Sequence, residues 1–198
     1  MTINAIRIVP ANEASDSDLE AVFGGGEGRG CQYFKLDQAE WTSTVSVDER
    51  AERLRAQSNC GHPQARTTSG LVAYWESEPA GWCAVEPRTA YSRLLRMRVP
   101  WSGRDEDKTD ENIWAVTCFV VRGGYRRRGI ATALAAAAAQ FARDHGARAI
   151  EGYARVVQEG DRFVPAYLYV GTLGLFAAAG FHEVSRPTAK RAVMRIDF

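Results

Sequence analysis

Runs of hydrophobic residues divide the chain into predicted strands and helices. Residues 113–121 (IWAVTCFVV) are nearly all apolar or β-branched, which predicts a strand buried on both faces of a sheet. Residues 71–75 and 81–85 flank the turn-forming stretch ESEPA and predict a hairpin. An alanine-rich segment after residue 129 predicts a long helix that ends near Gly146.

Weaker patterns complete the expected order, β-α-α-β-β-(α)-β-α-β-α-β-β. Ser15, Asp16 and Ser17 suit the N-terminus of a helix, and residues 48–57 alternate in charge as an exposed helical face does. Loops are expected over the glycine-rich residues 24–30 and over residues 58–70. The remaining strands are predicted over 5–9, 148–153, 181–184 and 191–196, and the remaining helices over 36–41, 89–97 and 171–179.

The composition is that of a globular protein, and the sequence contains neither a repeat nor a clear linker. The 198 residues are 45% hydrophobic and 25% charged, so we expect a single domain over residues 1–198. The net charge of +1 provides no general attraction to nucleic acid or to an anionic membrane, and we expect neither partner. The longest uncharged run, 163–181, contains one proline and three glycines and predicts a buried loop and helix rather than a membrane span.

The four cysteines, Cys31, Cys60, Cys83 and Cys118, are widely spaced, and none forms a C-x-x-C pair. We therefore expect four reduced thiols in a cytosolic protein. Residues 1–16 contain no long apolar signal core, which agrees with a cytoplasmic location. Cys60 and His62 have no further ligands at a suitable spacing, so we expect no metal site.

The segment 126–131 (RRRGIA) joins the central predicted strand to the alanine-rich helix and matches the pattern R/Q-x-x-G-x-G/A. The first N–H groups of a helix are unpaired and carry partial positive charge, which suits a phosphate group. Three arginines at a helix N-terminus oppose the helix dipole, where acidic residues are preferred. The alternative is a basic turn that only caps the helix, but the unfavourable charge favours an anion site.

The chain resembles the GNAT family of Gcn5-related N-acetyltransferases over most of its length. The resemblance rests on FVVRGGYRRRGIATAL (119–134), LFAAAGFHEV (175–184) and the hairpin 70–88. It implies an α/β (α+β) fold with a mixed, mostly antiparallel central sheet flanked by helices, whose central parallel strands splay apart near Cys118 and Gly152. It also implies acetyl-CoA as co-substrate, direct attack of a small-molecule or peptide amine in a ternary complex, and possible homodimerisation.

The resemblance also assigns the residues that hold the co-substrate. Backbone groups of the central strand pair with the pantetheine arm, and the N–H of Phe119 polarises the thioester carbonyl. N–H groups at the start of the following helix hold the pyrophosphate, with the hydroxyl of Thr132 nearby. The residues implied are Phe119, Val120, Val121, Arg126, Arg127, Arg128, Gly129, Ile130, Ala131 and Thr132.

Two positions depart from the family pattern and leave the proton transfers open. Phe176 occupies the position of a tyrosine that serves as general acid in much of the family, and Ala115 that of a carboxylate used by some members as base. We take Glu151 and Tyr153 as the candidate catalytic residues. In the alternatives, Glu151 pairs with a nearby arginine and Tyr153 is a wall residue. The further candidates are Glu86 and Cys118.

Arg88 and Tyr91, at the turn after the second strand of the hairpin, are candidate contacts to the acceptor, where an arginine suits an acidic group.

Two other functions compete with acyl transfer. A catalytically degenerate CoA-binding module is compatible with Phe176 and Ala115. A nucleic-acid binder would use residues 122–128 (RGGYRRR), but the near-zero net charge argues against it.

Overall fold

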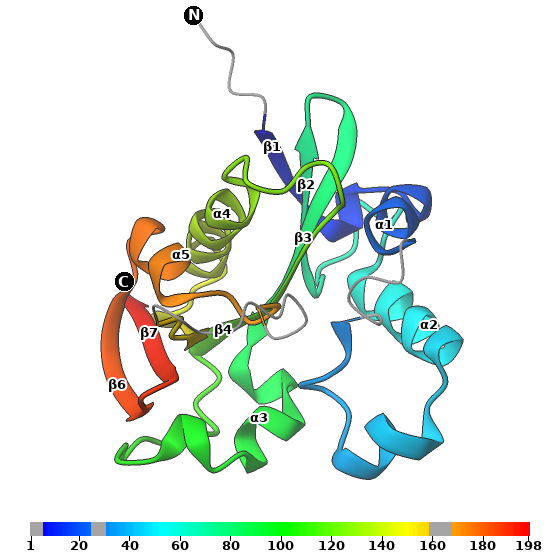
Figure 1. Ribbon diagram of the computed structural model, residues 1–198. Coiled ribbons are helices and arrows are strands. Elements are labelled where there is room, and N and C mark those ends of the chain that lie inside the picture. Colours follow the sequence, from blue (N-terminus) through cyan, green and yellow to red (C-terminus); the bar gives the residue numbers. More distant parts are fainter. Residues whose placement is uncertain (1–5, 25–30, 159–167) are drawn as a thin grey trace, which may run out of the picture.

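The computed structural model describes residues 6–24, 31–158 and 168–198, except for the side chains of residues 43 and 44. Its centre is a seven-stranded sheet with the strand order β1-β2-β3-β4-β5-β7-β6 (Figure 1). All neighbouring strands are antiparallel except β4 and β5, which are parallel. Helices pack against this sheet, so the predicted fold class is confirmed.

The elements follow the predicted order closely. The strands are β1 (Ile6–Pro10), β2 (Gly70–Trp75), β3 (Glu78–Pro87), β4 (Ile113–Val121), β5 (Ala149–Arg155), β6 (His182–Thr188) and β7 (Arg191–Asp197). The α-helices are α1 (Asp16–Phe23), α2 (Val47–Ser58), α3 (Ser92–Arg96), α4 (Ile130–Asp144) and α5 (Leu173–Ala178). Short 3-10 turns cover Ala11–Glu13, Arg88–Ala90 and Val99–Trp101, and a π-helical turn covers Glu40–Thr44.

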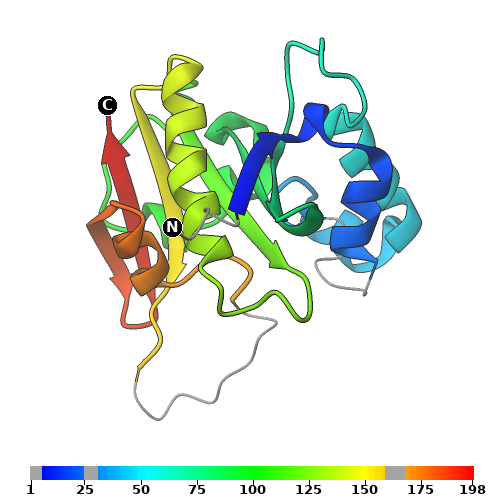
Figure 2. The same cartoon turned by 90° about the horizontal axis from the view of Figure 1, so that it is seen from above.

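The two faces of the sheet carry separate hydrophobic clusters. α4 and α5 pack on one face, where Leu134 and Phe176 are fully buried. α1 packs on the other face, where Leu19 lies in the same cluster as Trp82. Figures 1 and 2 show α4 beside α5 at the side of β6 and β7, and α1 beside α2 at the opposite side of the molecule. Because the side chains of β4 alternate between these clusters, β4 is buried on both faces, as its sequence predicts.

The helix predicted over 36–41 begins and ends later than expected. The Asp37 side chain accepts a hydrogen bond from the Glu40 N–H, and the Glu40 side chain accepts one from the Asp37 N–H. This reciprocal capping starts the helical turns after Asp37, and they continue to Thr44. Residues 25–30 of the predicted loop 24–30 and residues 163–167 of the uncharged run 163–181 lie outside the described residues.

Candidate active site

β4 and β5 separate halfway along β4. Their parallel pairing runs from Ile113↔Ala149 to Val116↔Gly152 and then stops. On its other side β4 stays paired with β3, but Thr117 is an extra residue between the pairs Ala84↔Cys118 and Val85↔Val116. Such a bulge bends and twists a strand, and it lies where the two parallel strands part. The splaying expected near Cys118 and Gly152 is therefore confirmed.

A segment that precedes α5 lies between the separated strands. The Phe119 N–H of β4 donates a hydrogen bond of 2.6 Å to the carbonyl of Tyr169, and the Arg155 N–H of β5 donates one of 2.9 Å to the carbonyl of Gly171. Arg155 and Thr172 also form a parallel bridge. The segment Tyr169–Thr172 thus occupies the gap, and the N–H expected to polarise a thioester is hydrogen-bonded within the protein.

The backbone groups of β4 alternate between β3 and this gap. Because the Phe119 N–H points into the gap, the backbone of Val120, which is paired with Trp82, points to β3. Val121 points again toward the gap, and its carbonyl accepts a hydrogen bond of 3.3 Å from Arg126 Nε. Of the three residues expected to pair with a pantetheine arm, Phe119 and Val121 therefore direct their backbone groups toward the gap, and Val120 does not.

The turn after β4 presents an exposed, basic helix N-terminus. Arg126, Arg127, Arg128 and Gly129 are exposed, and Arg127 and Gly129 have φ angles of 61° and 79°. Gly129 is the N-cap of α4, provides no side-chain cap, and is followed by a first turn without acidic residues. The Arg128 guanidinium lies 4.8 Å from the centre of the Trp75 ring.

This turn fits an anionic group. A Cβ atom built on Gly129 meets no atom within 4 Å, so the space beside the first N–H groups of α4 is open. Ile130 is buried and anchors the first turn, while Ala131 and Thr132 are partly exposed beside it. Unpaired N–H groups, three arginines and open space are the features that a pyrophosphate requires at a helix N-terminus.

Glu151 is fully buried and surrounded by guanidinium groups. Arg195 Nη1 lies 3.0 Å and Arg88 Nη1 3.7 Å from Oε1, while Arg104 donates to both carboxylate oxygens. The Tyr153 hydroxyl donates a hydrogen bond of 2.9 Å to Oε2. Both oxygens of Glu151 are thus engaged, which confirms the alternative that it pairs with arginine and disfavours a role as general base.

Burial, followed by the charge of Glu151, raises the pKa of Tyr153 well above its usual value, so its phenol stays protonated. Arg88 is fully buried, with Nη1 at 3.2 Å from Glu106 Oε2 and Nη2 on the carbonyl of Asp107. Tyr91 has an exposed fraction of 1%. Neither Arg88 nor Tyr91 reaches a surface, so the structure favours structural roles for both over the predicted contact with substrate.

The two departures from the family pattern lie in tightly packed surroundings. The Phe176 ring is fully buried and packs edge-on against Phe119, with 5.8 Å between ring centres. A Cβ atom on Gly152 would approach the Phe176 ring to 2.2 Å, so glycine is required there. Ala115 lies on β4 between Glu86 of β3 and Glu151 of β5 in the strand register.

Glu86 is a carboxylate on the same row of the sheet as Ala115. Burial raises the pKa of the Glu86 carboxyl, and the ion pair with Lys35 Nζ at 2.5 Å opposes that rise. Glu86 does not line the cavity between the loop 31–36, β5 and the β6–β7 hairpin. Its position therefore supports a buried ion pair, and nothing in its contacts directs it toward an acceptor.

The cysteine prediction is wrong for two of the four residues. Cys31 and Cys118 form a disulfide between the loop before α2 and β4, directly beside Phe119. Cys60 and Cys83 are buried free thiols, as expected. The 87-residue separation hides the pairing in the sequence, because only the packing of the 31–36 loop against the α1 face of β4 brings the two residues together. Disulfides are uncommon in cytosolic proteins, so the cysteines no longer support a cytosolic location.

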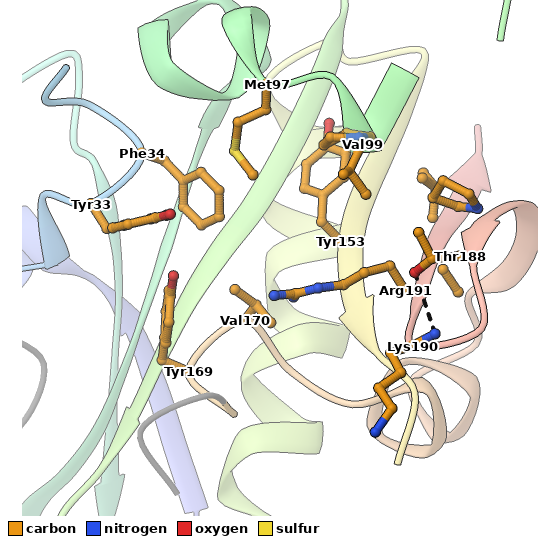
Figure 3. Close-up of a pocket in the computed structure, with 14 residues that line it drawn as sticks. Tyr33, Phe34, Met97, Val99, Tyr153, Tyr169, Val170, Thr188, Lys190 and Arg191 are labelled. Atoms are coloured by element: carbon orange, nitrogen blue, oxygen red, sulfur yellow. Dashed lines mark hydrogen bonds between the residues drawn. The ribbon is translucent and has the colours of Figure 1, made fainter. Parts of the chain in front are cut away.

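A cavity of about 340 Å³ opens beside the separated strands (Figure 3). Sequence reasoning found only Tyr153 among its residues, because the walls come from segments far apart in the chain. The lining residues are Tyr33, Phe34, Met97, Val99, Pro100, Tyr153, Tyr169, Val170, Pro187, Thr188, Lys190, Arg191, Ala192 and Val193. Tyr169 belongs both to this wall and to the segment in the gap, where its carbonyl accepts the hydrogen bond from the Phe119 N–H.

Within residues 6–24, 31–158 and 168–198, no group of three or more His, Cys, Asp or Glu side chains is placed to hold a metal ion. In the same described part of the chain, no helix is long and apolar enough to cross a membrane.

Comparisons with known proteins agree with this geometry. The chain is similar in fold to yncA of Salmonella typhimurium, a putative acetyltransferase solved with its cofactor acetyl-CoA (15% identity, TM-score 0.53, covering 98% of this chain and 94% of that chain). It is similar to an N-acetyltransferase from Staphylococcus aureus Mu50 (14% identity, TM-score 0.53, covering 97% of this chain and 98% of that chain). It is also similar to a ribosomal-protein-alanine N-acetyltransferase from Brucella melitensis (16% identity, TM-score 0.51, covering 98% of this chain and 99% of that chain).

No curated protein sequence matches the chain significantly. The family model of the acetyltransferase (GNAT) family matches residues 32–167, which is more than half of the chain. The match includes the separated strands β4 and β5 and the basic turn before α4. With these features in place, the chain belongs to the GNAT acetyltransferase family.

Proposed function

We propose that this protein transfers an acetyl group from acetyl-CoA to an amine by direct attack in a ternary complex. The observation that carries the proposal is the placement of the Phe119 N–H in the gap between β4 and β5. Phe119 lies on the same strand that leads into the basic N-terminus of α4. One continuous edge thus offers a hydrogen-bond donor for a thioester carbonyl at one end and an anion site at the other.

Different residues of this edge bind different parts of acetyl-CoA in this proposal. Phe119 and Val121 offer backbone groups to the amide-containing pantetheine arm, as an added strand does. The first N–H groups of α4, at Gly129, Ile130 and Ala131, hold the pyrophosphate, with the Thr132 hydroxyl nearby. Arg126, Arg127 and Arg128 add the positive charge that balances the phosphates.

The Phe119 N–H has to change partner during the reaction. In the structure it donates to the Tyr169 carbonyl, so a thioester carbonyl reaches this N–H only after the Tyr169 carbonyl moves away. The N–H then stabilises negative charge that develops on the thioester oxygen, as an oxyanion donor does. The segment Tyr169–Thr172 therefore competes with the co-substrate for the gap between the strands.

The state of the cysteines supports direct attack without an acyl-enzyme. Cys31 and Cys118 are joined in a disulfide, and Cys60 and Cys83 are buried thiols whose pKa values are raised by burial. A thiolate nucleophile needs a lowered pKa and access to substrate, which none of the four residues has. The amine nitrogen itself therefore forms the new bond to the carbonyl carbon while the bond from that carbon to sulfur breaks.

Solvent, rather than a carboxylate of the protein, removes the proton from the acceptor amine in this proposal. In the part of the chain that the structure describes, no Asp or Glu lines the cavity. An ordinary alkyl amine has a pKa of about 10.4 and must lose a proton before attack. In this proposal, water accepts this proton. Tyr153 forms the wall against which the amine lies, and Glu151 positions Tyr153 through their 2.9 Å hydrogen bond.

The test is a search for turnover with [¹³C]acetyl-CoA and a panel of amines, read by mass spectrometry of the small molecules and of the intact protein. The proposal predicts an acetylated acceptor, no acetylated protein, and intersecting initial-rate lines. A labelled protein that passes its acetyl group to the amine contradicts direct attack. Binding of acetyl-CoA without turnover of any amine favours the alternative of a CoA-binding module.

A further inference from the structure

An arginine reaches into the cavity beside the separated strands, and no carboxylate of the described residues pairs with it. The Arg191 side chain extends from the start of β7 toward Tyr169 and Val170 (Figure 3). In the described part of the chain, Arg191 forms no ion pair. The neighbouring arginines on the same hairpin differ, because Arg186 pairs with Glu183 and Arg195 pairs with Glu106, Glu151 and Asp197.

The strand register places a second cation next to Arg191. Arg191 is directly opposite Arg155 in the antiparallel pairing of β7 with β5, so both side chains lie on the same face of the sheet. Burial, with the nearby charge of Arg155, lowers the pKa of Arg191. A partly buried guanidinium that no carboxylate of the described residues balances is unfavourable unless an anion joins it. This arrangement therefore indicates a site for an acidic group.

Apart from Thr188 and Lys190, the other residues that line the cavity are apolar or aromatic. They include Tyr33, Phe34, Met97, Val170 and Val193, the first four of which are labelled in Figure 3. The volume of about 340 Å³ is at the lower end for small-molecule pockets, which excludes a large acceptor from the cavity itself. A bound molecule needs one acidic group for Arg191 and an apolar body for these walls.

The cavity shares Tyr169 with the segment that lies in the gap between β4 and β5. Tyr169 lines the cavity with its side chain, while its carbonyl accepts the hydrogen bond from the Phe119 N–H. We propose that the acceptor is a small amine of amino-acid size that carries one acidic group, bound by Arg191, and an apolar or aromatic body. This inference rests on the proposed function, since it names the substrate class of the same site.

The test compares acidic ligands with their neutral amides by calorimetry. The probes are N-acetyl derivatives of L-phenylalanine, L-leucine and L-methionine, each as the free acid and as the amide. They are titrated into the wild-type protein, Arg191→Gln, Arg191→Lys and the control Arg143→Gln, which alters an exposed arginine in the last turn of α4. The phosphonate analogue of N-acetylphenylalanine distinguishes recognition of a carboxylate from recognition of a tetrahedral anion.

We expect at least one acid to bind the wild type about tenfold or more tightly than its amide, the range of a charge-assisted hydrogen bond. Arg191→Gln removes this preference, Arg191→Lys keeps part of it, and Arg143→Gln keeps it fully. Equal affinity of every acid and amide, binding of neither, or an unchanged preference in Arg191→Gln overturns the inference. Tighter binding of the phosphonate than of the carboxylate assigns the site to a tetrahedral anion.

Titration of acetyl-CoA into the same samples separates this inference from the proposed function. Acetyl-CoA binding without any preference for acids refutes the acidic acceptor and leaves acyl transfer standing. A preference for acids without acetyl-CoA binding refutes acyl transfer and leaves the Arg191 site standing. Circular dichroism of each variant confirms that a lost preference does not come from a lost fold.

Discussion

At the scale of single residues, the sequence singles out both Gly129 and Glu151 as candidate functional residues, but the structure places them in different environments. Gly129 is exposed at the start of α4, with open space where a side chain would begin. Glu151 is fully buried and bound by arginines. The sequence motif around Gly129 predicts its environment, because a strand, a turn and a helix are local features. The environment of Glu151 depends on arginines 44 to 63 residues away, which no local pattern reveals.

Replacement of Gly129 by leucine is expected to weaken acetyl-CoA binding at least tenfold, because the side chain fills the approach to the first N–H groups of α4. The change also forces leucine into a left-handed conformation, which costs about 1–2 kcal/mol. Gly146→Leu is the matched control, since Gly146 follows the other end of α4, has the same φ of 79°, and is equally open. Calorimetry and thermal unfolding of both variants measure the two effects. Equal acetyl-CoA affinities refute the pyrophosphate site.

Replacement of Glu151 by glutamine is expected to lower the free energy of unfolding by about 3–5 kcal/mol, because Arg88, Arg104 and Arg195 lose the buried carboxylate that they share. Their remaining acidic partners, Glu106 and Asp197, are more exposed. Glu183→Gln breaks an ion pair with Arg186 that lies closer to the surface, and a change of about 0–1 kcal/mol is expected there. Urea unfolding of the two variants gives the comparison. A Glu151→Gln protein as stable as the wild type would show that the arginine cluster does not depend on this carboxylate.

At the scale of elements, β4 connects the predicted and the unpredicted parts of the site. Its bounds, its burial and the helix after it are predicted from residues 113–146, because continuous apolar runs and a glycine-bounded helix are strong signals. The bulge at Thr117 is not predicted, since the sequence VTCF looks like any regular strand. The segment that fills the gap is also missed, because its contacts with β4 and β5 are tertiary.

The N-terminus of α1 provides a test of an element that the sequence predicts well. Asp18 caps the Ser15 N–H and accepts a hydrogen bond of 2.8 Å from the Tyr74 hydroxyl. Burial opposes ionisation of Asp18, but these hydrogen bonds prevail and lower its pKa. The stabilisation is therefore present above the usual pKa of 3.8 and lost as pH falls through the lower value in the folded protein.

Asp18→Asn is accordingly expected to cost about 1 kcal/mol at neutral pH and progressively less below pH 4. The measurement is the free energy of unfolding of both proteins between pH 2 and pH 7. Asp16→Asn, in the first turn of the same helix, serves as the control. A difference between Asp18→Asn and the wild type that stays constant over this range contradicts the assigned role of the carboxylate.

At the scale of the whole molecule, the disulfide joins the loop before α2 to β4, the strand of the proposed acyl-transfer site. The link between Cys31 and Cys118 spans 87 residues and holds this loop against β4. The walls of the cavity come from that loop, from the segment between α3 and β4, from β5, from the segment before α5 and from the β6–β7 hairpin. Because these segments lie far apart in the chain, the sequence predicts the fold and the basic turn before α4 but only one residue of the cavity.

Removal of the disulfide by Cys31→Ser/Cys118→Ser is expected to lower the free energy of unfolding by about 2–4 kcal/mol, because the unfolded chain gains freedom. Denaturant unfolding of this variant beside Cys60→Ser, which alters a buried free thiol, measures the effect. Intact-mass analysis of the unreduced wild type should show one disulfide. Four titratable thiols in the unfolded wild-type protein would contradict this link.

The central claim is that the edge formed by β4 and the N-terminus of α4 binds acetyl-CoA. The most direct measurement is calorimetric titration of the wild-type protein with acetyl-CoA and with S-acetylpantetheine, which has the same thioester and arm but lacks the phosphates and the adenosine. We predict micromolar binding of acetyl-CoA and binding of S-acetylpantetheine that is weaker by a factor of about 100, as loss of several charge-assisted hydrogen bonds requires. Absence of acetyl-CoA binding, or equal affinity for the two compounds, would contradict the account.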